Sequence, residues 1–345
     1  MSAVAFDNVS IVFGDAPKKA LPLMDQGLDR GAIQLQTGQV LGVHDCTLSV
    51  DTGEILVLMG LSGSGKSTLL RAVNGLNPVI RGDIRINDGD WQCNIANCTA
   101  SDLQRVRREC VSMVFQQFGL LPWRSVRENV GLGLELAGMD KAARRKRVDQ
   151  ELDMVGLADR ADALVGELSG GMQQRVGLAR AFATDAPILL MDEPFSALDP
   201  LIRTRLQDEL LDLQKQRGRT IIFVSHDLDE AFKIGNRIAI MEGGRIVQTG
   251  TPRQIFTNPV NNYVADFVAH MNPLGVLTAR DVMTSGGATG PRVDAETPVQ
   301  DILKQIGNGT LQVIENGALI GRVTQASLLA RLTPSSAVES DEQIT

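Results

Sequence analysis

The sequence predicts an α/β fold whose core is a parallel sheet. Three apolar runs, at residues 54–59, 187–191 and 220–224, are rich in Val, Ile and Leu and do not alternate with polar residues. Such runs are typical of strands that are buried on both faces. Helical patterns lie between the runs, and the pattern after Pro200 has its apolar positions at Ile202, Leu206, Leu210 and Leu213. Strands that alternate with helices indicate an α/β core.

Size and charge limit the kinds of protein that this chain can be. The chain has 345 residues, enough for about two domains, a net charge of -7 and 4% aromatic residues. Nucleic-acid binders usually carry a basic excess and aromatic side chains for base stacking, so we expect no nucleic-acid partner. No apolar stretch approaches the ~20 residues of a membrane-spanning helix, and residues 1–14 do not resemble a secretory signal. Any membrane part must therefore come from other chains.

The cysteines indicate neither a disulfide framework nor a zinc site. Their spacing is irregular in a long chain, and no second pair or histidine lies near the two that are closest in sequence. We therefore expect structural or incidental thiols at Cys46, Cys93, Cys98 and Cys110.

Residues 111–184 are predicted to be a mostly helical subdomain inserted between two strands of the core. Ser125 and Glu128 have the spacing of a capping box before an apolar run. A second amphipathic helix is indicated by Val148, Leu152 and Val155.

The strongest motif is GLSGSGKST at residues 60–68, which directly follows a predicted strand. Glycines allow backbone N–H groups to turn inward and cradle phosphate oxygens. Lys66 brings a positive charge to the β- and γ-phosphates of a nucleotide, and Ser67 supplies a hydroxyl to Mg²⁺. The residues predicted to hold the nucleotide here are Gly60, Ser62, Gly63, Ser64, Gly65, Lys66, Ser67 and Thr68.

A second motif ends the strand at residues 188–191 with Asp192 and Glu193. Asp192 has the place of a Mg²⁺ ligand, and Glu193 that of a group that orients the attacking water. A strand that ends in Asp-Glu is common by itself. Together with a phosphate loop, at the end of a parallel strand, it indicates a P-loop NTPase core.

A third motif is ELSGGMQQR at residues 167–175. Ser169 and the N–H groups of Gly170 and Gly171 precede a predicted helix, which makes a second anion-binding helix start. The motif resembles the Leu-Ser-Gly-Gly-Gln signature of the ATP-binding cassette (ABC) family, with Met172 in place of its last residue.

This resemblance implies a RecA-like P-loop NTPase fold with an antiparallel β subdomain and an α-helical signature subdomain. It extends over roughly residues 6–270, and we expect residues 1–270 to be the ATP-binding cassette domain. It also implies a homodimer, because the signature of one copy would bind the γ-phosphate held by the phosphate loop of the other. Two glycine-lined half-sites, at residues 60–67 and 169–171, would then form each complete site.

Four more positions match the family in order. Gln116 resembles the Q-loop glutamine that meets Mg²⁺ and the transmembrane subunit, and Asp199 lies in the D-loop pattern. His226 resembles the switch histidine that contacts the γ-phosphate. Phe13 resembles the aromatic residue that stacks on adenine, although a core position is an equal alternative.

The resemblance implies an ATPase that uses ATP and Mg²⁺. Its catalytic residues would be Glu193, His226 and Lys66, and its metal ligands Ser67, Gln116 and Asp192. The other two histidines, His44 and His270, lack such a context, and we interpret them as structural.

A narrower resemblance concerns the solute. A long segment at residues 17–42, with the patterns at residues 196–203 and 225–231, resembles the quaternary-amine importers, which carry choline, glycine betaine or proline betaine. Residues 116–123 and 263–273 favour the choline branch. This resemblance implies a peripheral subunit on the cytoplasmic side of the cell membrane, bound to transmembrane permease subunits, with an external binding protein that delivers the solute.

Three alternatives remain at this stage. The solute of the importer could be an amino acid or a polyamine. A soluble cassette ATPase of DNA repair or translation is disfavoured, because there is one phosphate loop and no sustained heptad pattern. A regulatory module with a vestigial ATPase is opposed by the intact Lys66, Asp192, Glu193 and His226.

The C-terminal part is predicted to be a small α+β segment at residues 277–332. Asn316-Gly317 between two apolar runs is a strong hairpin signal. The segment resembles a single cystathionine-β-synthase-type (CBS) repeat, which normally occurs in pairs. Since about 55 residues bury little core alone, a working sensor, a pair with the copy in the other subunit and a remnant are all open. Residues 333–345 are expected to be a disordered tail.

Overall fold

The chain forms two compact units in the computed structural model, which describes residues 1–269, 271–287, 289–307 and 309–332. The units are Met1–Thr251 and Pro252–Thr345, and each is described by itself. The division lies earlier than the boundary near residue 270 that we expected. The reason is that α11 (Pro252–Thr257) packs with the second unit: Arg253 donates to Asp281 Oδ1 at 2.8 Å, and Phe256 joins that unit's apolar cluster.

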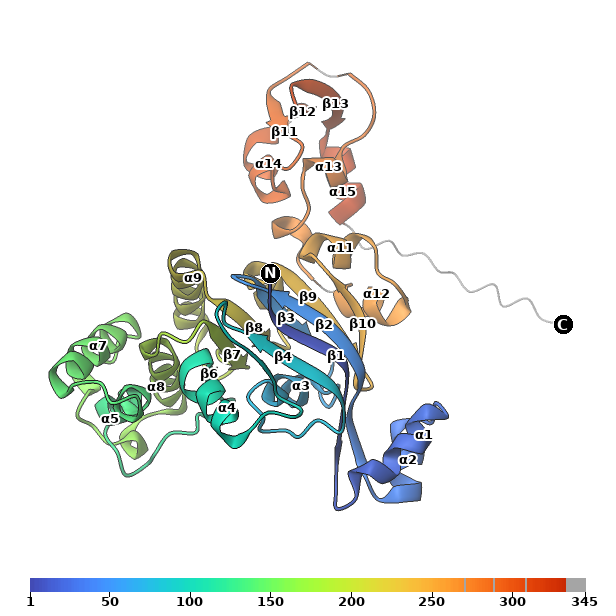
Figure 1. The fold of residues 1–345 in the computed structure, drawn as a ribbon. Helices are drawn as coiled ribbons and strands as arrows, with labels where there is room; N and C mark the ends of the chain where they lie inside the picture. Colours follow the sequence, from blue (N-terminus) through green and yellow to red (C-terminus); the bar gives the residue numbers. More distant parts are fainter. Residues whose placement is uncertain (270, 288, 308, 333–345) are drawn as a thin grey trace. The chain divides into compact units, whose positions relative to one another are not determined.

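The core of the first unit is a six-stranded sheet with the order β10-β9-β3-β8-β7-β6. All residues of the three central strands are buried, which confirms the runs predicted from the sequence. Strand β10 pairs antiparallel with β9, and the remaining pairs are parallel (Figure 1). The strands are β3 (Ile55–Met59), β6 (Val111–Val114), β7 (Ile188–Asp192), β8 (Thr220–Val224), β9 (Arg237–Glu242) and β10 (Arg245–Gly250).

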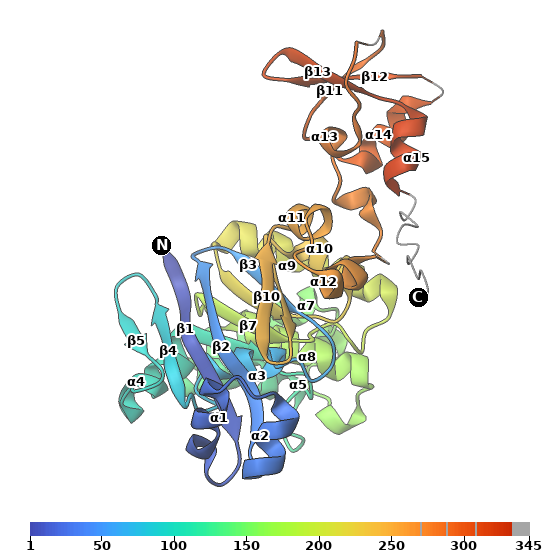
Figure 2. The ribbon, with the colours of Figure 1, turned by 90° about the vertical axis from the view of Figure 1, so that its right-hand side faces the viewer.

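A second, antiparallel sheet has the order β2-β1-β4-β5. Its strands are β1 (Ser2–Phe13), β2 (Val40–Asp51), β4 (Arg81–Asn87) and β5 (Gln92–Asn94). Helix α3 (Lys66–Ala72) contributes Leu69 and Leu70 to one apolar cluster that also contains Leu58 of β3 and Ile84 of β4. The two sheets therefore share a core around α3, as Figures 1 and 2 show.

The helical subdomain lies between β6 and β7 (Figure 1). It begins later than expected, because Val111–Val114 pairs with β7 as an edge strand of the core sheet. The capping box of Ser125 and Glu128 is present at the start of α5. The helices of the subdomain are α5 (Val126–Val130), α6 (Leu132–Leu136), α7 (Lys141–Met154) and α8 (Gly170–Ala183), with short turns at Ala158–Arg160 and Val165–Glu167.

Most of the segment at residues 17–42 forms a small helical hairpin between β1 and β2, drawn in blue in Figure 1, and residues 40–42 begin β2. It consists of a short turn (Pro17–Ala20), α1 (Leu21–Asp25) and α2 (Arg30–Thr37). Asp29 caps α2 by accepting from Ala32 N at 2.8 Å. Buried Ile33 anchors α2 in a separate apolar cluster with Val12 and Leu41.

The other helices of the first unit cover the core sheet and its edges. They are α4 (Ala100–Arg105), a π-helical turn (Val106–Cys110), α9 (Pro200–Arg217) and α10 (Leu228–Ile234).

The second unit contains a three-stranded sheet, β11-β12-β13, with helices on it. The predicted hairpin is confirmed: Asn316 and Gly317 connect β12 and β13 with φ of 50° and 81°, as a tight hairpin turn requires. The elements are α12 (Asn262–Val268), a turn (Pro273–Gly275), α13 (Ala279–Val282), β11 (Arg292–Asp294), α14 (Val299–Ile306), β12 (Leu311–Glu315), β13 (Ala318–Val323) and α15 (Gln325–Leu332).

This unit has an apolar core of its own, contrary to our expectation of little buried core. Val299 and Ile302 of α14, Val313 of β12 and Val323 of β13 are completely buried together. The short strand β11 was missed in the sequence, and it enlarges the sheet that α14 covers. The resemblance to a CBS repeat stays a prediction, and the expected tail at residues 333–345 lies outside the described residues.

The cysteines are free thiols with the structural surroundings that we expected. Burial raises the pKa of Cys46 and Cys93 to about 11 and that of Cys110 to about 12, whereas Cys98 is half-buried. Among the described residues, no group of three or more His, Cys, Asp or Glu side chains could hold a metal ion.

We predict that three of the four thiols of the native chain, those of Cys46, Cys93 and Cys110, react slowly with a thiol reagent at pH 8. The three thiols with raised pKa are protonated and shielded at this pH, so Cys98 should react first and at most one thiol should react rapidly. The release of thionitrobenzoate from Ellman's reagent measures this, and in guanidinium chloride all four thiols should react. Rapid reaction of two or more native thiols would contradict it.

Candidate nucleotide-binding site

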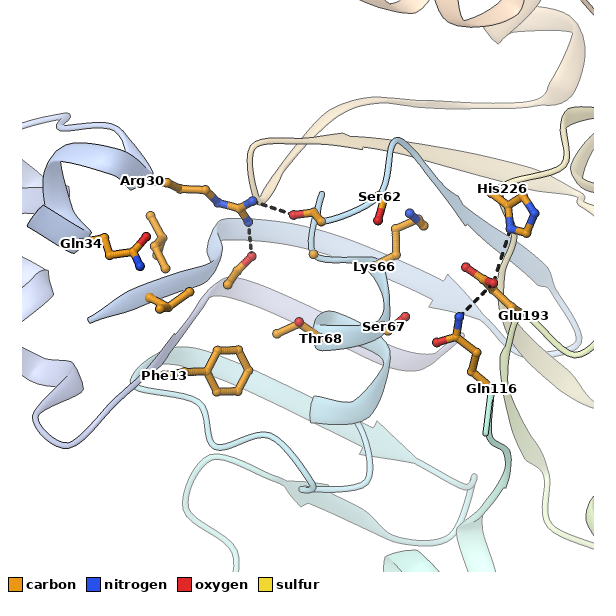
Figure 3. A pocket seen from close by; sticks show the side chains of 15 residues that line it. Phe13, Arg30, Gln34, Ser62, Lys66, Ser67, Thr68, Gln116, Glu193 and His226 are labelled. Atoms are coloured by element: carbon orange, nitrogen blue, oxygen red, sulfur yellow. Dashed lines mark hydrogen bonds and ion pairs between the residues drawn. The ribbon is translucent and has the colours of Figure 1, made fainter. Parts of the chain in front are cut away.

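One pocket of the first unit brings together most of the residues predicted to bind a nucleotide (Figure 3). Its volume is about 640 Å³, which is typical of sites for small organic ligands. The lining residues come from the phosphate loop, from the ends of the core strands and from the β1–α2–β2 region. They are Phe13, Arg30, Gln34, Val40, Leu41, Gly42, Ser62, Gly63, Gly65, Lys66, Ser67, Thr68, Gln116, Glu193 and His226.

The phosphate loop connects β3 to α3, and two of its glycines are required by close backbone contacts. Gly60 has φ 140°, and a Cβ there would lie 2.1 Å from the carbonyl oxygen of Met241. Gly65 has φ 102°, and its Cβ would lie 2.7 Å from the carbonyl oxygen of Gly42. Only glycine fits at these two positions, because the backbone of the loop packs directly against the backbones of β9 and β2.

Lys66 lies inside the curve of this loop. Its Nζ donates to the carbonyl oxygens of Gly60 at 2.8 Å and Leu61 at 3.0 Å. Burial lowers the pKa of the Lys66 ammonium, while Glu193 and Asp192 act to raise it. Phosphate oxygens are stronger acceptors than these carbonyls, so the ammonium can transfer its hydrogen bonds to a nucleotide.

Asp192 is completely buried at the end of β7, directly behind the loop. Its Oδ1 accepts from Ser67 Oγ at 2.6 Å, and its Oδ2 accepts from Arg71 Nη2 at 2.8 Å. The guanidinium compensates the buried carboxylate, which would otherwise be costly. A hydroxyl and a carboxylate oxygen at this separation, with the Gln116 amide lining the same pocket, are the oxygen donors that Mg²⁺ prefers.

Glu193 carries the carboxylate that points toward the pocket (Figure 3). Its Oε2 accepts from Gln116 Nε2 at 3.1 Å and lies 3.4 Å from His226 Nδ1. Three side chains from the ends of three segments therefore meet at one oxygen atom. Such a group can orient a water molecule and accept its proton.

The backbone of Glu193 is held in an unusual conformation. Its φ is 48°, in the left-handed region, which costs a residue with a side chain of order 1–3 kcal/mol. Its carbonyl oxygen accepts from Ser196 Oγ at 3.0 Å and from Gln174 Nε2 at 3.2 Å. Gln174 lies on α8, so the signature helix itself holds the backbone from which this carboxylate extends.

Phe13 lies at the opposite end of the pocket from Glu193 (Figure 3). Its side chain is 37% exposed, so the structure places it on the pocket wall and not in the core. A Cβ on Gly42 would lie 2.9 Å from the Phe13 ring and 3.1 Å from Thr68 Cγ2. The ring therefore rests on the bare backbone of β2, where a flat base can stack on it.

The signature residues and Asp199 are not among the residues that line this pocket. Ser169 begins α8 and accepts from Met172 N at 3.4 Å, and Asp199 begins α9 and accepts from Ile202 N at 3.0 Å. Ser169 and Gly170 are exposed, so another molecule can reach them.

Sequence analysis missed several residues of the site. Arg30, Gln34 and Gly42 line the pocket, Arg71 holds the Asp192 carboxylate, and Gln174 holds the backbone of Glu193. The sequence does contain a pattern that predicts the helix of Arg30 and Gln34, because Asp29 is a typical N-cap and Gly38 a typical C-cap for a helix at residues 30–37. No local pattern in the sequence indicates that Gly42, Arg71 and Gln174 belong to the site.

His44 is buried beside Arg245 Nη2, which lies 2.7 Å from its Nδ1. It does not line the pocket, which agrees with the structural interpretation. Residue 270, the other histidine that we interpreted as structural, lies outside the described residues. In the described part of the chain, no helix has the length and apolarity needed to cross a membrane.

Comparison with known proteins identifies the fold and relatives of the whole chain. The family model described as ABC transporter matches residues 43–196. The glycine betaine/proline betaine transport system ATP-binding protein ProV of Escherichia coli (strain K12) is 45% identical over 342 residues, 96% of this chain and 83% of that protein. The trimethylamine N-oxide transport system ATP-binding protein TmoW of Ruegeria pomeroyi is 42% identical over 334 residues, 95% of this chain and 96% of that protein.

A solved dimeric structure of a bacterial ABC transporter cassette is also similar, with a TM-score of 0.62 and 29% identity over 72% of this chain and 98% of the other. Another, at 30% identity with the same TM-score and coverage, is described as a post-hydrolysis state bound to ADP and Pi. These matches confirm the α/β cassette fold predicted from the sequence.

Proposed function

This chain belongs to the ABC transporter family, and we propose that it is the subunit that hydrolyses ATP to drive uptake of a small quaternary amine or amine oxide. The observation that carries the catalytic part is the convergence of Gln116 and His226 on Glu193 Oε2, in the pocket that also contains Lys66. Relatives that match almost the full chain suggest the solute class.

In the proposed site, ATP spans the pocket from end to end. The adenine stacks on Phe13, and the phosphates lie in the loop against Lys66. Mg²⁺ bound by Ser67, Asp192 and Gln116 would neutralise phosphate charge. Glu193 Oε2 orients the attacking water and accepts its proton, and His226 contacts the γ-phosphate. The bond from the γ-phosphorus to the bridging oxygen breaks, and ADP leaves with the electron pair.

A second copy of the chain would complete each site. Ser169, Gly170 and Gly171 lie outside the pocket of their own chain, and the first two are exposed, so they can approach the γ-phosphate only of another molecule. Asp199 at the start of α9 would lie at the same contact. The dimer would bind transmembrane permease subunits on the cytoplasmic side of the cell membrane, with solute delivered by an external binding protein.

The proposed solute carries a methylated nitrogen centre. One relative is named for glycine betaine and proline betaine, and the other for trimethylamine N-oxide. All three compounds carry a nitrogen bonded to four substituents with a formal positive charge, which aromatic side chains of a binding protein can recognise. Choline shares this group and remains within the proposal. An amino acid or polyamine importer is the alternative.

The transport proposal is tested in liposomes that contain this chain with its permease and binding protein. ATP should drive the uptake of labelled glycine betaine, trimethylamine N-oxide or choline, and glycine, which lacks the methylated nitrogen, should be left outside. Competition among the three compounds would identify the preferred solute. Uptake of glycine or a polyamine with none of the methylated compounds would refute the proposed solute class.

Glu193→Gln should bind ATP and form stable dimers, but hydrolyse it about 10²–10³ times more slowly, because the amide cannot accept the proton of water. Phosphate release measures the rate, and size-exclusion chromatography with ATP measures the dimer. Glu242→Gln, a change at an exposed residue at the end of β9, is the control and should leave the rate unchanged. Normal turnover in Glu193→Gln would remove this residue from the catalytic role.

The shared site predicts complementation between two variants. Lys66→Ala should lose ATP binding, and Ser169→Ala should lose turnover with little loss of binding. A mixed dimer has one site with the intact loop of one copy and the intact signature of the other, so mixing should recover part of the ATPase activity that neither variant has alone. If the mixture is as inactive as its components, the two half-sites do not belong to different copies.

A further inference from the structure

We propose that helix α2 of the inserted segment at residues 17–42 is a nucleotide-binding element, in which Arg30 fixes the distance between the phosphate loop and the aromatic platform of Phe13. The inference rests on the proposed function, since it takes the ligand of the pocket to be a nucleotide. Arg30 is a positioning residue in this scheme, because it acts through the backbone of the pocket.

The guanidinium of Arg30 connects two parts of the pocket wall. Its Nη1 donates to the carbonyl oxygen of Gly63 in the phosphate loop at 2.7 Å. Its Nη2 donates to the carbonyl oxygen of Gly42 on β2. Figure 3 shows both hydrogen bonds and the side chain that reaches from α2 toward the loop.

The two acceptors belong to different elements of the pocket wall, β2 and the phosphate loop, which meet where the Gly42 carbonyl oxygen faces Gly65. Gly42 lies under Phe13, since a Cβ at that position would be 2.9 Å from the Phe13 ring. Gly63 lies among the loop residues that precede Lys66. A planar group bonded to both carbonyls therefore holds β2, on which the Phe13 ring rests, against the phosphate loop, and ATP has to fit the platform and the loop at once.

The helix that carries Arg30 has a fixed position. Ile33 is completely buried in the cluster with Val12 of β1 and Leu41 of β2, the residues next to Phe13 and Gly42 in sequence. Gln34 lies one turn after Arg30, on the same face of α2, and its exposed side chain lines the same pocket. Helix α2 thus forms one wall of the pocket, to which it contributes the guanidinium of Arg30 and the amide of Gln34.

The guanidinium also has one donor that is not used. Its Nε is buried and has no hydrogen-bond partner among the residues that the structure describes. Since this atom is shielded from the pocket by the protein itself, its unused donor is a cost of the position that the two Nη atoms hold. The positive charge beside the loop favours an anionic ligand.

Arginine is needed for this task, because its planar fork can donate in two fixed directions. Lysine keeps the charge but is a compact point charge on a flexible stem, so it cannot hold both carbonyls in the same geometry. The variant Arg30→Lys therefore keeps the positive charge and removes the connection between the carbonyls of Gly42 and Gly63, so it tests that connection separately from the charge.

The test is equilibrium binding to the full chain, with a fluorescent ATP analogue displaced by ATP or by inorganic tripolyphosphate. Arg30→Lys should raise the Kd for ATP about five- to tenfold, on the scale of one charge-assisted hydrogen bond. The Kd for tripolyphosphate, which occupies only the phosphate end, should stay within about twofold of the unaltered chain. In ATPase assays, KM should rise by the same factor as the Kd, and kcat should stay within about twofold.

The matched control is Lys19→Arg, a conservative exchange at an exposed residue of the same segment, which should leave both Kd values unchanged. If Arg30→Lys fails to melt cooperatively, Gln34→Ala takes its place and should raise the Kd for ATP about threefold, with tripolyphosphate unaffected.

An unchanged Kd for ATP in both variants would overturn the inference. Equal losses for ATP and tripolyphosphate would also overturn it, because Arg30 would then act on the phosphate loop alone. Failure of the unaltered chain to bind ATP counts instead against the proposed function.

Discussion

Three neighbouring parallel strands end side by side, and the chemistry of this chain depends on that constraint. Strands β3, β8 and β7 are adjacent in the core sheet, and every residue in them is buried. The chain must leave each strand at the same edge, so Gly60, Asp192 and Ser225 emerge together, and Glu193 and His226 follow them at once. Loss of register in any one of the three strands would move its side chain out of reach of the others.

Glu193, the proposed acceptor of the water proton, has a backbone conformation that is unfavourable by itself. Glu193 adopts a left-handed backbone that only surrounding contacts can maintain. One of these contacts comes from Gln174, on the same helix that Ser169 begins. A displacement of the signature helix would thus reach Glu193 directly, which gives a physical connection between the exposed Ser169 and this carboxylate.

Much of the fold and site follows from local patterns in the sequence. Continuous apolar runs predict the central strands, and the spacing of glycines with Lys66 predicts the loop, because both depend on neighbouring residues alone. The contribution of Gly42 and Arg71 depends on strands and helices that meet only after folding, and no local pattern records it. The same reason explains why the earlier boundary at Thr251 and the buried core of the second unit differ from expectation.

The core of the second unit also bears on how such a chain can be assembled over time. The apolar cluster of the second unit is made of side chains from residue 256 onward, chiefly from α13, α14 and the sheet β11-β12-β13. A segment with an apolar interior of its own can be duplicated or transplanted by recombination as one piece, because its buried side chains move with it. The part of the chain from α13 onward is therefore the piece that recombination could exchange between cassettes as a block.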